Sequence, residues 1–496
     1  NFILDNRSVP QHDLISYIQF PADHIWVAYE WLSDALMAAL VRIGGLNLLA
    51  VFVSCGLGWL FVLIYDRCRK EGSHFLTAAF LVIIGALTSA LHWLARPHIF
   101  TFFGVFIFTT KLEDYYRGTI SNTRLLLWLA ATMIVWVNCH PAFLLGYALI
   151  GIYIVGTLMT AFYCQAGEIR QKYLARAKHM CLCLGAVIVA SFVNPYGPKL
   201  FQYIFEYLKG NFILNATDEF ASPVFHGSIH SFFWEVLLFM FIVALSVSAK
   251  RLSPPQMLCC LAFIFLSLSA VRNIPLFVIM FLPAIALLSS KLQILRGSSH
   301  PDSQLTEANR DQIRESTWWQ NLVAKWHRVG DMCDDMEWQC KMHLLPLLLL
   351  IGCSVMAIFH IGGKDGLNCV FNPDNMPVET LSFLKQNEDS GKLHFDRGFN
   401  FDNWGGYIRY VLGTRVFIDD RADFYGPARY MQYSNVSLVS PGWQKVLNDN
   451  KIEWIIFPND SRLVAALKES SDWKLLKKDK AASLFARTGV DLPGEP

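Results

Sequence analysis

The chain has 496 residues, of which 54% are hydrophobic and 17% are charged, and its formal net charge is +2. A soluble protein of this length would carry about a quarter charged residues. The deficit is uneven, because residues 44–290 are nearly all apolar runs whereas residues 362–496 have an ordinary soluble composition. This contrast predicts a polytopic α-helical membrane protein with a water-exposed C-terminal domain.

Composition and motifs also exclude several classes of function. The small net charge and the lack of a basic stripe with interleaved aromatic residues exclude a nucleic-acid partner. The GxSxG, HExxH and P-loop motifs are absent, as is GxGxxG between a strand and a helix, so hydrolase, NTPase and dinucleotide chemistry have no support. Because the chain begins in a polar loop without an initiating Met, a further hydrophobic span is expected upstream of residue 1.

Apolar windows of roughly 15 to 24 residues predict membrane spans along most of the chain. The windows lie near residues 44–65, 73–94, 97–111, 124–139, 141–164, 178–193, 231–249, 255–270, 272–290 and 343–361. Residues 25–42 mix Trp, Tyr and Leu with acidic residues, which predicts an amphipathic helix at the membrane surface.

Lys and Arg residues predict the orientation, because they accumulate in cytoplasmic loops. They gather in residues 65–72, 111–124, 165–180 and 291–342, and the intervening loops hold far fewer. The predicted organisation begins with a transmembrane domain at 1–290, whose outer loops are 1–43 and 194–230. A cytoplasmic linker at 291–342 and a last transmembrane helix at 343–361 follow. The chain then continues with an extracytoplasmic α/β domain at 362–496.

Four polar, Pro-bearing breaks fall at the predicted outer face. They are Ala95-Arg-Pro-His98, Asn138-Cys-His-Pro141, Asn194-Pro-Tyr-Gly197 and Arg272-Asn-Ile-Pro275. Irregular backbone at membrane depth occurs only where protein or a water-filled cavity surrounds it. Together the breaks predict a polar cavity that opens outward, although any one of them could be a helix cap followed by a Pro stop.

Two carboxylates near this face, Asp13 and Glu30, are candidates for a general base and for ligands of a divalent metal ion. Asp13 could instead be a solvated turn residue or an N-cap. Glu30 could instead be the structural partner of an Arg.

Four cationic or potentially cationic residues lie at the same level, namely Arg96, His98, His140 and Arg272. Such a set suits a phosphate or diphosphate headgroup, because Arg can bind two oxygens at once. His98 could instead cap its helix.

The C-terminal segment alternates predicted strands and helices, which indicates a small α/β domain. The expected strands are 392–395, 416–418, 452–457, 473–476 and 482–485, and the expected helices are 377–387, 427–433, 442–449 and 461–469. Within residues 403–426, NWGGYIRYVLGTRVFIDDRADFYG, a turn is expected at Gly405-Gly406. Asp419, Asp420 and Arg421 would follow a strand, either as a ligand site or as a self-satisfied structural network, and the structural network is favoured.

Several of these stretches together resemble a family of bacterial polytopic membrane proteins grouped with the GT-C glycosyltransferases. They are Asp13-x-x-Ser16, Glu30-Trp-Leu32, the ARPH and NPYG breaks and the cassette at 403–426. The resemblance covers nearly the whole chain apart from residues 291–342. It implies a GT-C-like fold in the bacterial inner membrane and transfer of a sugar from a polyprenyl-phosphate donor to an acceptor at the extracytoplasmic face.

The resemblance also implies roles for individual residues. Asp13 matches the aspartate of the first outer loop that acts as base or metal ligand, and Arg96, His98 and Arg272 match phosphate binders. Asp13 departs from the family pattern because no second acidic residue adjoins it, and the sequence lacks the family's first transmembrane helix. A non-catalytic subunit of a larger membrane assembly therefore stays open as the alternative, in which Asp13 would be paired with a nearby basic residue.

Overall fold

The computed structural model describes residues 1–18, 20, 25–165, 167–209, 218–226, 228–290, 325, 328–330, 332–333, 352, 369–389 and 397–489. The chain forms two compact units. The described residues of 29–201 and 218–290 belong to the helical unit, and those of 2–28, 202–209 and 369–489 belong to the α/β unit. Apart from isolated positions, the predicted linker 291–342 and the predicted span 343–361 lie outside the described residues, as does the predicted strand 392–395.

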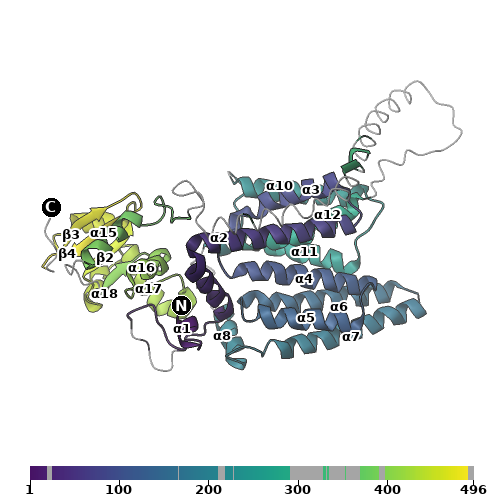
Figure 1. Ribbon diagram of the computed structural model, residues 1–496, viewed down its shortest axis with the longest axis horizontal. Helices are drawn as coiled ribbons and strands as arrows, with labels where there is room; N and C mark the ends of the chain where they lie inside the picture. Colours follow the sequence, from purple (N-terminus) through teal and green to yellow (C-terminus); the bar gives the residue numbers. More distant parts are fainter. Residues whose placement is uncertain are drawn as a thin grey trace, which may run out of the picture. The chain divides into compact units, whose positions relative to one another are not determined.

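The helical unit is a bundle whose long helices run side by side (Figure 1). Its helices are α2 (Trp31–Lys70), α3 (Phe75–Ser89), α4 (His98–Arg117), α5 (Asn122–Trp136), α6 (Leu144–Tyr163), α7 (Glu168–Ala190), α10 (Ile229–Val247), α11 (Pro254–Ser269) and α12 (Ile274–Ser289). Four 3₁₀ turns join them, η1 (Ala90–His92), η2 (Pro141–Phe143), η3 (Asp218–Phe220) and η4 (Val271–Asn273). Helix α8 (Pro198–Lys209) follows α7.

Six helical stretches of the described residues are long and apolar enough to cross a membrane. They are Trp31–Lys70, Phe75–His92, Pro141–Tyr163, Glu168–Ala190, Ile229–Val247 and Val271–Ser289. The last is the core of the bundle, because 72% of its apolar window is buried, compared with 28–39% in the others. The nine predicted spans that end before residue 291 all coincide with helices. Because several of these helices are long and apolar enough to cross a membrane, the chain is a multi-pass membrane protein.

Local sequence explains where several of these helices begin. The Ser121 side chain accepts a hydrogen bond from the backbone N–H of Arg124 at the start of α5. Ser253 and Gln256 form a capping box at the start of α11. Such caps satisfy backbone N–H groups that have no partner inside the helix.

Helix α2 is broken by a pair of glycines. Gly45 has φ 65°, in the left-handed region that a side chain disfavours, and Gly44 is also non-helical. The first arm begins at Trp31 and matches most of the predicted surface helix 25–42, and the second arm contains the predicted span 44–65 apart from Gly44 and Gly45. The two predicted elements therefore meet at this break.

Among its described residues, the α/β unit contains one sheet of four strands in the order β1-β2-β4-β3. Strand β1 (Gly398–Asn400) is parallel to β2 (Trp454–Pro458), and β4 (Ala482–Arg487) is antiparallel to both β2 and β3 (Trp473–Lys478). The helices are α1 (Phe2–Asn6), α15 (Val378–Asp389), α16 (Gly405–Leu412), α17 (Ala422–Ser437), α18 (Trp443–Asp449) and α19 (Arg462–Glu469), with the 3₁₀ turn η7 (Asp402–Trp404). The predicted strands 452–457, 473–476 and 482–485 and the four predicted helices are all present.

Residues from the N-terminus belong to this unit because they pair with the segment beside β1. Ser16 and Val416 form a parallel bridge, and the Val416 N–H donates to the carbonyl of Ile15 at 3.0 Å. The Asn400 side chain in turn holds this segment, since it donates to the carbonyl of Ile418 at 2.8 Å and accepts from the N–H of Phe417 at 3.0 Å. The predicted strand 416–418 is thus a buried, extended segment with one bridge and is not a regular strand.

The turn expected at Gly405-Gly406 is wrong, because these residues begin helix α16. Gly405 has helical dihedral angles, φ −56° and ψ −48°. A Cβ on Gly405 would lie 2.3 Å from the carbonyl oxygen of Ile418, whereas a Cβ on Gly406 would have no neighbour within 4 Å. Gly405 is therefore needed for close approach of two backbone segments, and Gly406 is not.

This difference between neighbouring glycines gives a matched test. Gly405→Ala should destabilise the α/β unit by about 2 kcal/mol, because an inserted methyl group forces the backbone apart. Gly406→Ala should leave stability unchanged or raise it slightly, since Ala is the better helix former. The denaturation midpoints of the two variants would be compared with that of the wild type, and equal midpoints would contradict the close-approach explanation.

Candidate functional site

The described structure places the predicted site residues in two groups. Glu30, Arg96, His98, His140 and Arg272 belong to the helical unit, and Asp13 belongs to the α/β unit. Each group has its own geometry.

The group in the helical unit is built at the turns that connect its helices. Glu30 directly precedes α2, His98 is the first residue of α4, His140 directly precedes η2 and Arg272 lies in η4. Pro97 and Pro141 help to set these boundaries, because Pro fits the first positions of a helix. We call Glu30, His92, Arg96, His98, His140 and Arg272 the turn cluster.

Three histidines lie close together in the turn cluster and all are buried. The ring centroids of His92 and His98 are 4.4 Å apart. The Nε2 of His98 lies 2.9 Å from the carbonyl oxygen of His92, and since a carbonyl only accepts, this nitrogen carries a proton. His140 Nδ1 lies 2.8 Å from the hydroxyl of Thr101, and its Nε2 lies 3.6 Å from Oε1 of Glu30.

The two arginines of the turn cluster both contact the 3₁₀ turn η3. Arg96 forms an ion pair of 2.5 Å with Glu219, and the Arg272 guanidinium lies 4.5 Å from the ring centre of Phe220. The Arg96 side chain is 47% exposed, so an anion from solvent can compete with Glu219 for it. Arg272 also lies within electrostatic range of His98 and His140.

Asp13 is held by four hydrogen bonds. Its Oδ1 accepts from the N–H of Ile15 at 3.0 Å and from Nη2 of Arg421 at 2.8 Å. Its Oδ2 accepts from the N–H of Ser16 at 3.1 Å and from the Ser16 hydroxyl. Each carboxylate oxygen thus has two donors, and the side chain is 7% exposed.

Arg421 is the centre of this second group. Its Nε lies 2.9 Å and 3.0 Å from the two carboxylate oxygens of Asp419, and its guanidinium stacks 4.5 Å from the ring centre of Trp26. The favoured Asp–Arg network is thus present as Asp13, Asp419 and Arg421. Asp420 is exposed, which corrects the expectation that it belongs to the network.

These contacts determine the protonation of Asp13. Burial by itself would raise its pKa, but the charge of Arg421 and the hydrogen bonds from Ser16 and Ile15 outweigh burial and hold the pKa below its usual value. The pairing therefore stabilises the fold at any pH above about 4 and is lost as the pH falls through the lowered pKa. At neutral pH Asp13 is an ionised, fully hydrogen-bonded carboxylate.

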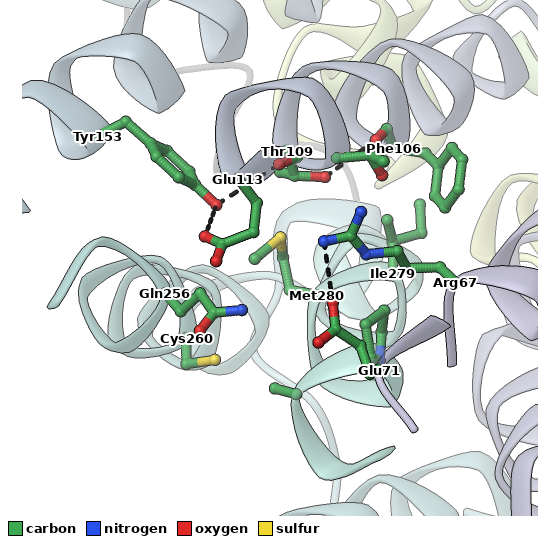
Figure 2. A pocket seen from close by; sticks show the side chains of 13 residues that line it. Arg67, Glu71, Phe106, Thr109, Glu113, Tyr153, Gln256, Cys260, Ile279 and Met280 are labelled. Atoms are coloured by element: carbon green, nitrogen blue, oxygen red, sulfur yellow. Dashed lines mark hydrogen bonds and ion pairs between the residues drawn. The ribbon is translucent and has the colours of Figure 1, made fainter. Parts of the chain in front are cut away.

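A pocket of the helical unit is lined by Phe106, Thr109 and Glu113 of α4 (Figure 2), which lie in the half of that helix away from His98. Because α4 has 20 residues, its two ends are about 30 Å apart. The pocket encloses about 420 Å³, open mouth included. None of the six predicted site residues lines it. Its polar wall is formed by residues of α2, α4, α6 and α11 and by the C-cap of α2, namely Arg67, Glu71, Thr109, Thr110, Glu113, Tyr153 and Gln256.

The charged groups at this pocket form a continuous chain of ion pairs. Arg67 binds Asp114 at 2.6 Å and Glu71 at 2.9 Å. Arg117 then binds Glu71 at 2.8 Å and Glu113 at 2.6 Å. The chain ties the C-terminal end of α2 to that of α4, and the Tyr153 hydroxyl extends it to α6 by donating to Glu113 at 3.1 Å.

Comparison with known proteins gives a match in structure only. Models of known protein families do not match the chain, and neither do the sequences of characterised proteins. The oligosaccharyltransferase of Archaeoglobus fulgidus, with a tethered acceptor peptide containing the NVT sequon, matches with a TM-score of 0.54 at 12% identity over 99% of this chain and 69% of that one. Its apo form matches with a TM-score of 0.54 at 13% identity over 99% and 70%. The chain has a GT-C-like fold.

A third structure agrees with this assignment. The oligosaccharyltransferase AglB from Archaeoglobus fulgidus, in complex with an inhibitory peptide and a dolichol-phosphate, matches with a TM-score of 0.53 at 12% identity over 99% of this chain and 69% of that one. The similarity extends over nearly all of the chain.

Several contacts of these sites were not predicted from the sequence. The partner of Asp13 is 408 residues away, so no local pattern could identify it. The Asp13-x-x-Ser16 spacing is nevertheless typical of a side-chain-capped turn, and it indicates the Ser16 bond. The chain of ion pairs has a weaker signal, since Arg67 and Glu71, like Glu113 and Arg117, are four residues apart on a helix.

The Asp419–Arg421 pair can be tested against the adjacent exposed carboxylate. Asp419→Asn should lower stability by about 3 kcal/mol, because it leaves the buried Arg421 partly uncompensated. Asp420→Asn should leave the denaturation midpoint unchanged. If the two variants unfold together with the wild type, the network does not stabilise the unit.

The ion-pair chain gives a second matched test within helix α2. Arg67→Met should destabilise the bundle by about 3 kcal/mol, because Glu71 and Asp114 each lose a partner in a buried setting. Lys70→Met removes the exposed pair with Asp66 and should have a much smaller effect. The thermal unfolding midpoints of Arg67→Met and Lys70→Met would be measured in detergent. Equal midpoints would contradict a stabilising role for the chain of ion pairs.

Proposed function

We propose that this protein is a membrane glycosyltransferase that moves a sugar from a polyprenyl-phosphate donor to an acceptor at the extracytoplasmic face. The similarity to an oligosaccharyltransferase over 99% of the chain is the observation that carries the proposal. The distribution of Lys and Arg supports an outer position for the turn cluster and for the α/β unit. The family resemblance of the sequence implies a bacterial inner membrane.

The turn cluster supplies groups suited to the reaction. Arg96 and Arg272 bind the phosphate of the donor, with Arg96 exchanging Glu219 for a phosphate oxygen. His98 offers no proton from Nε2, which is bonded to the His92 carbonyl, so it contributes to the shape of the site. Glu30 is the carboxylate of the turn cluster, and its side chain is 26% exposed, so an acceptor can reach it.

The reaction that these groups support is a single displacement. Glu30 takes the proton of the acceptor hydroxyl, the oxygen attacks C1 of the sugar, and the bond from C1 to the phosphate oxygen breaks. The polyprenyl phosphate leaves with the bonding electrons, and the two arginines balance its charge. Within the described residues no three His, Cys, Asp or Glu side chains lie close enough together to hold a metal ion.

Asp13 remains a second candidate for the base because of the resemblance. To act, it would have to give up Arg421, since its oxygens already have four donors. Because the Asp13 carboxylate already has four donors, its environment also supports the alternative function. In that alternative the protein is a non-catalytic subunit of a larger membrane assembly that contains lipid-linked substrates or other membrane proteins.

The two carboxylates and the alternative function can be separated in one assay. Purified protein in lipid nanodiscs would receive a radiolabelled undecaprenyl-phosphate hexose and a detergent extract of cell envelope as acceptor, and release of undecaprenyl phosphate would be measured. Glu30→Gln should reduce turnover by at least about a hundredfold, the usual effect of removing a general base. Arg272→Gln should chiefly raise KM for the donor.

The controls identify which part of the proposal fails. Loss of turnover in folded Asp13→Asn, with Glu30→Gln active, would assign the base to Asp13. Binding of undecaprenyl phosphate without turnover by the wild type would favour the non-catalytic subunit.

A further inference from the structure

The turn before α2 and the turn before η2 are bound together tightly. The Trp31 indole N–H donates to Oδ1 of Asn138 at 2.8 Å, and the Leu32 N–H donates to the Asn138 carbonyl at 3.1 Å. The Ser33 hydroxyl lies 2.8 Å from the carbonyl of Glu30 and 2.9 Å from that of Cys139. Glu30 and His140 are therefore carried by one rigid double turn.

The hydrogen bonds around Thr101 determine which ring nitrogen of His140 carries the proton. The Trp136 indole N–H can only donate, and it lies 2.9 Å from the Thr101 oxygen, which therefore accepts. The hydroxyl proton of Thr101 is then available for His140 Nδ1 at 2.8 Å. The backbone N–H of Ala142 also donates to Nδ1, at 3.4 Å. Two donors meet at Nδ1, so a neutral ring has its proton on Nε2.

That Nε2 proton is directed at Glu30. The distance of 3.6 Å to Oε1 exceeds a direct hydrogen bond in this state. Hydrogen bonds of catalytic groups are often longer in ligand-free structures and shorten when substrate binds. The His140 ring is 8% exposed and cannot turn away, whereas Glu30 is 26% exposed and lies at the N-terminal end of α2, where the helix dipole favours its charged form.

We propose that Thr101 and His140 are positioning residues for Glu30: Thr101 holds His140 in the Nε2–H tautomer, and His140 aims the Glu30 carboxylate at the acceptor hydroxyl. This inference rests on the proposed function, since it assigns the base of that reaction. His140 does not take the proton of the acceptor, because its Nδ1 is occupied by two donors and its Nε2 is already protonated. It keeps Glu30 ionised and in one orientation.

The inference predicts a specific effect of removing the Thr101 hydroxyl. Thr101→Val keeps the shape of the side chain but releases Nδ1, so the ring can take the other tautomer and present a lone pair to Glu30. Turnover should fall by about tenfold with little change in KM, since orientation of the base changes and donor binding does not. The acid limb of the pH profile should move to higher pH, because Glu30 loses a donor that favours its charged form.

Other charged groups face this pair and must be the same in every variant. His92, His98 and Arg272 act on His140, and Asp34 lies with Glu30 beside Cys139. Thr101→Ser retains the hydroxyl and should restore both turnover and the pH profile. Thr109→Val is the matched control, since Thr109 lies two turns further along α4 and its hydroxyl bonds only to carbonyls of α4.

The test uses the full-length protein in nanodiscs with the radiolabelled undecaprenyl-phosphate hexose. Wild-type turnover and an unshifted pH limb in Thr101→Val, with Glu30→Gln inactive, would overturn the inference and leave the proposed function intact. Full activity of Glu30→Gln would remove the proposed base and this inference with it. If Thr101→Val does not fold, His140→Gln places an amide N–H near the position of Nε2 and should retain more turnover than His140→Ala. Equal turnover of those two variants would also overturn the inference.

Discussion

The α/β unit depends on the guanidinium of Arg421, which binds Asp419 from its own loop and Asp13 from the opposite end of the sequence. A buried charge of this kind is unfavourable unless acidic groups compensate it, and Asp419 and Asp13 compensate the charge of Arg421. Trp26 covers the guanidinium and comes from the same N-terminal segment as Asp13. Together with the bridge between Ser16 and Val416, these contacts make residues 2–28 a structural part of a unit that is otherwise formed by the C-terminal end of the chain.

The helical unit depends on a different constraint, which concerns the polar groups at its turns. Its turns carry polar groups that lipid would not accommodate, and within the described residues each of these groups contacts another part of the protein. The side chains of Asn138 and Ser33 donate to backbone carbonyls, Thr101 binds Trp136 and His140, and Arg96 binds Glu219. The result is a set of turns held by hydrogen bonds and ion pairs, in which part of the Arg96 and Glu30 side chains stays exposed. This arrangement suits the proposed binding of a charged lipid headgroup.

The two ends of α4 show how one helix serves both stability and chemistry. Its first residues, from His98 to Thr101, contact the histidines of the turn cluster, while Glu113, Asp114 and Arg117 near its last turn bind the end of α2. The charges at the C-terminal end saturate one another, so the pocket beside them is bounded by a network that holds helices together. The two groups of contacts are thus separated by about 30 Å, the length of the helix.

The sequence by itself determined the membrane class, the positions of the bundle helices, the α/β alternation of the C-terminal segment and the placement of Glu30, Arg96, His98, His140 and Arg272 at turns. These features are local, because each span must satisfy its own backbone hydrogen bonds and reveals itself by length and hydrophobicity alone. Only the tertiary structure decided that Arg421 holds Asp13, that Gly405 begins a helix against Ile418, and that Thr101 selects the tautomer of His140. Each of these depends on groups far apart in the chain, and no local propensity or spacing records which distant donor will meet a given acceptor once the chain has packed.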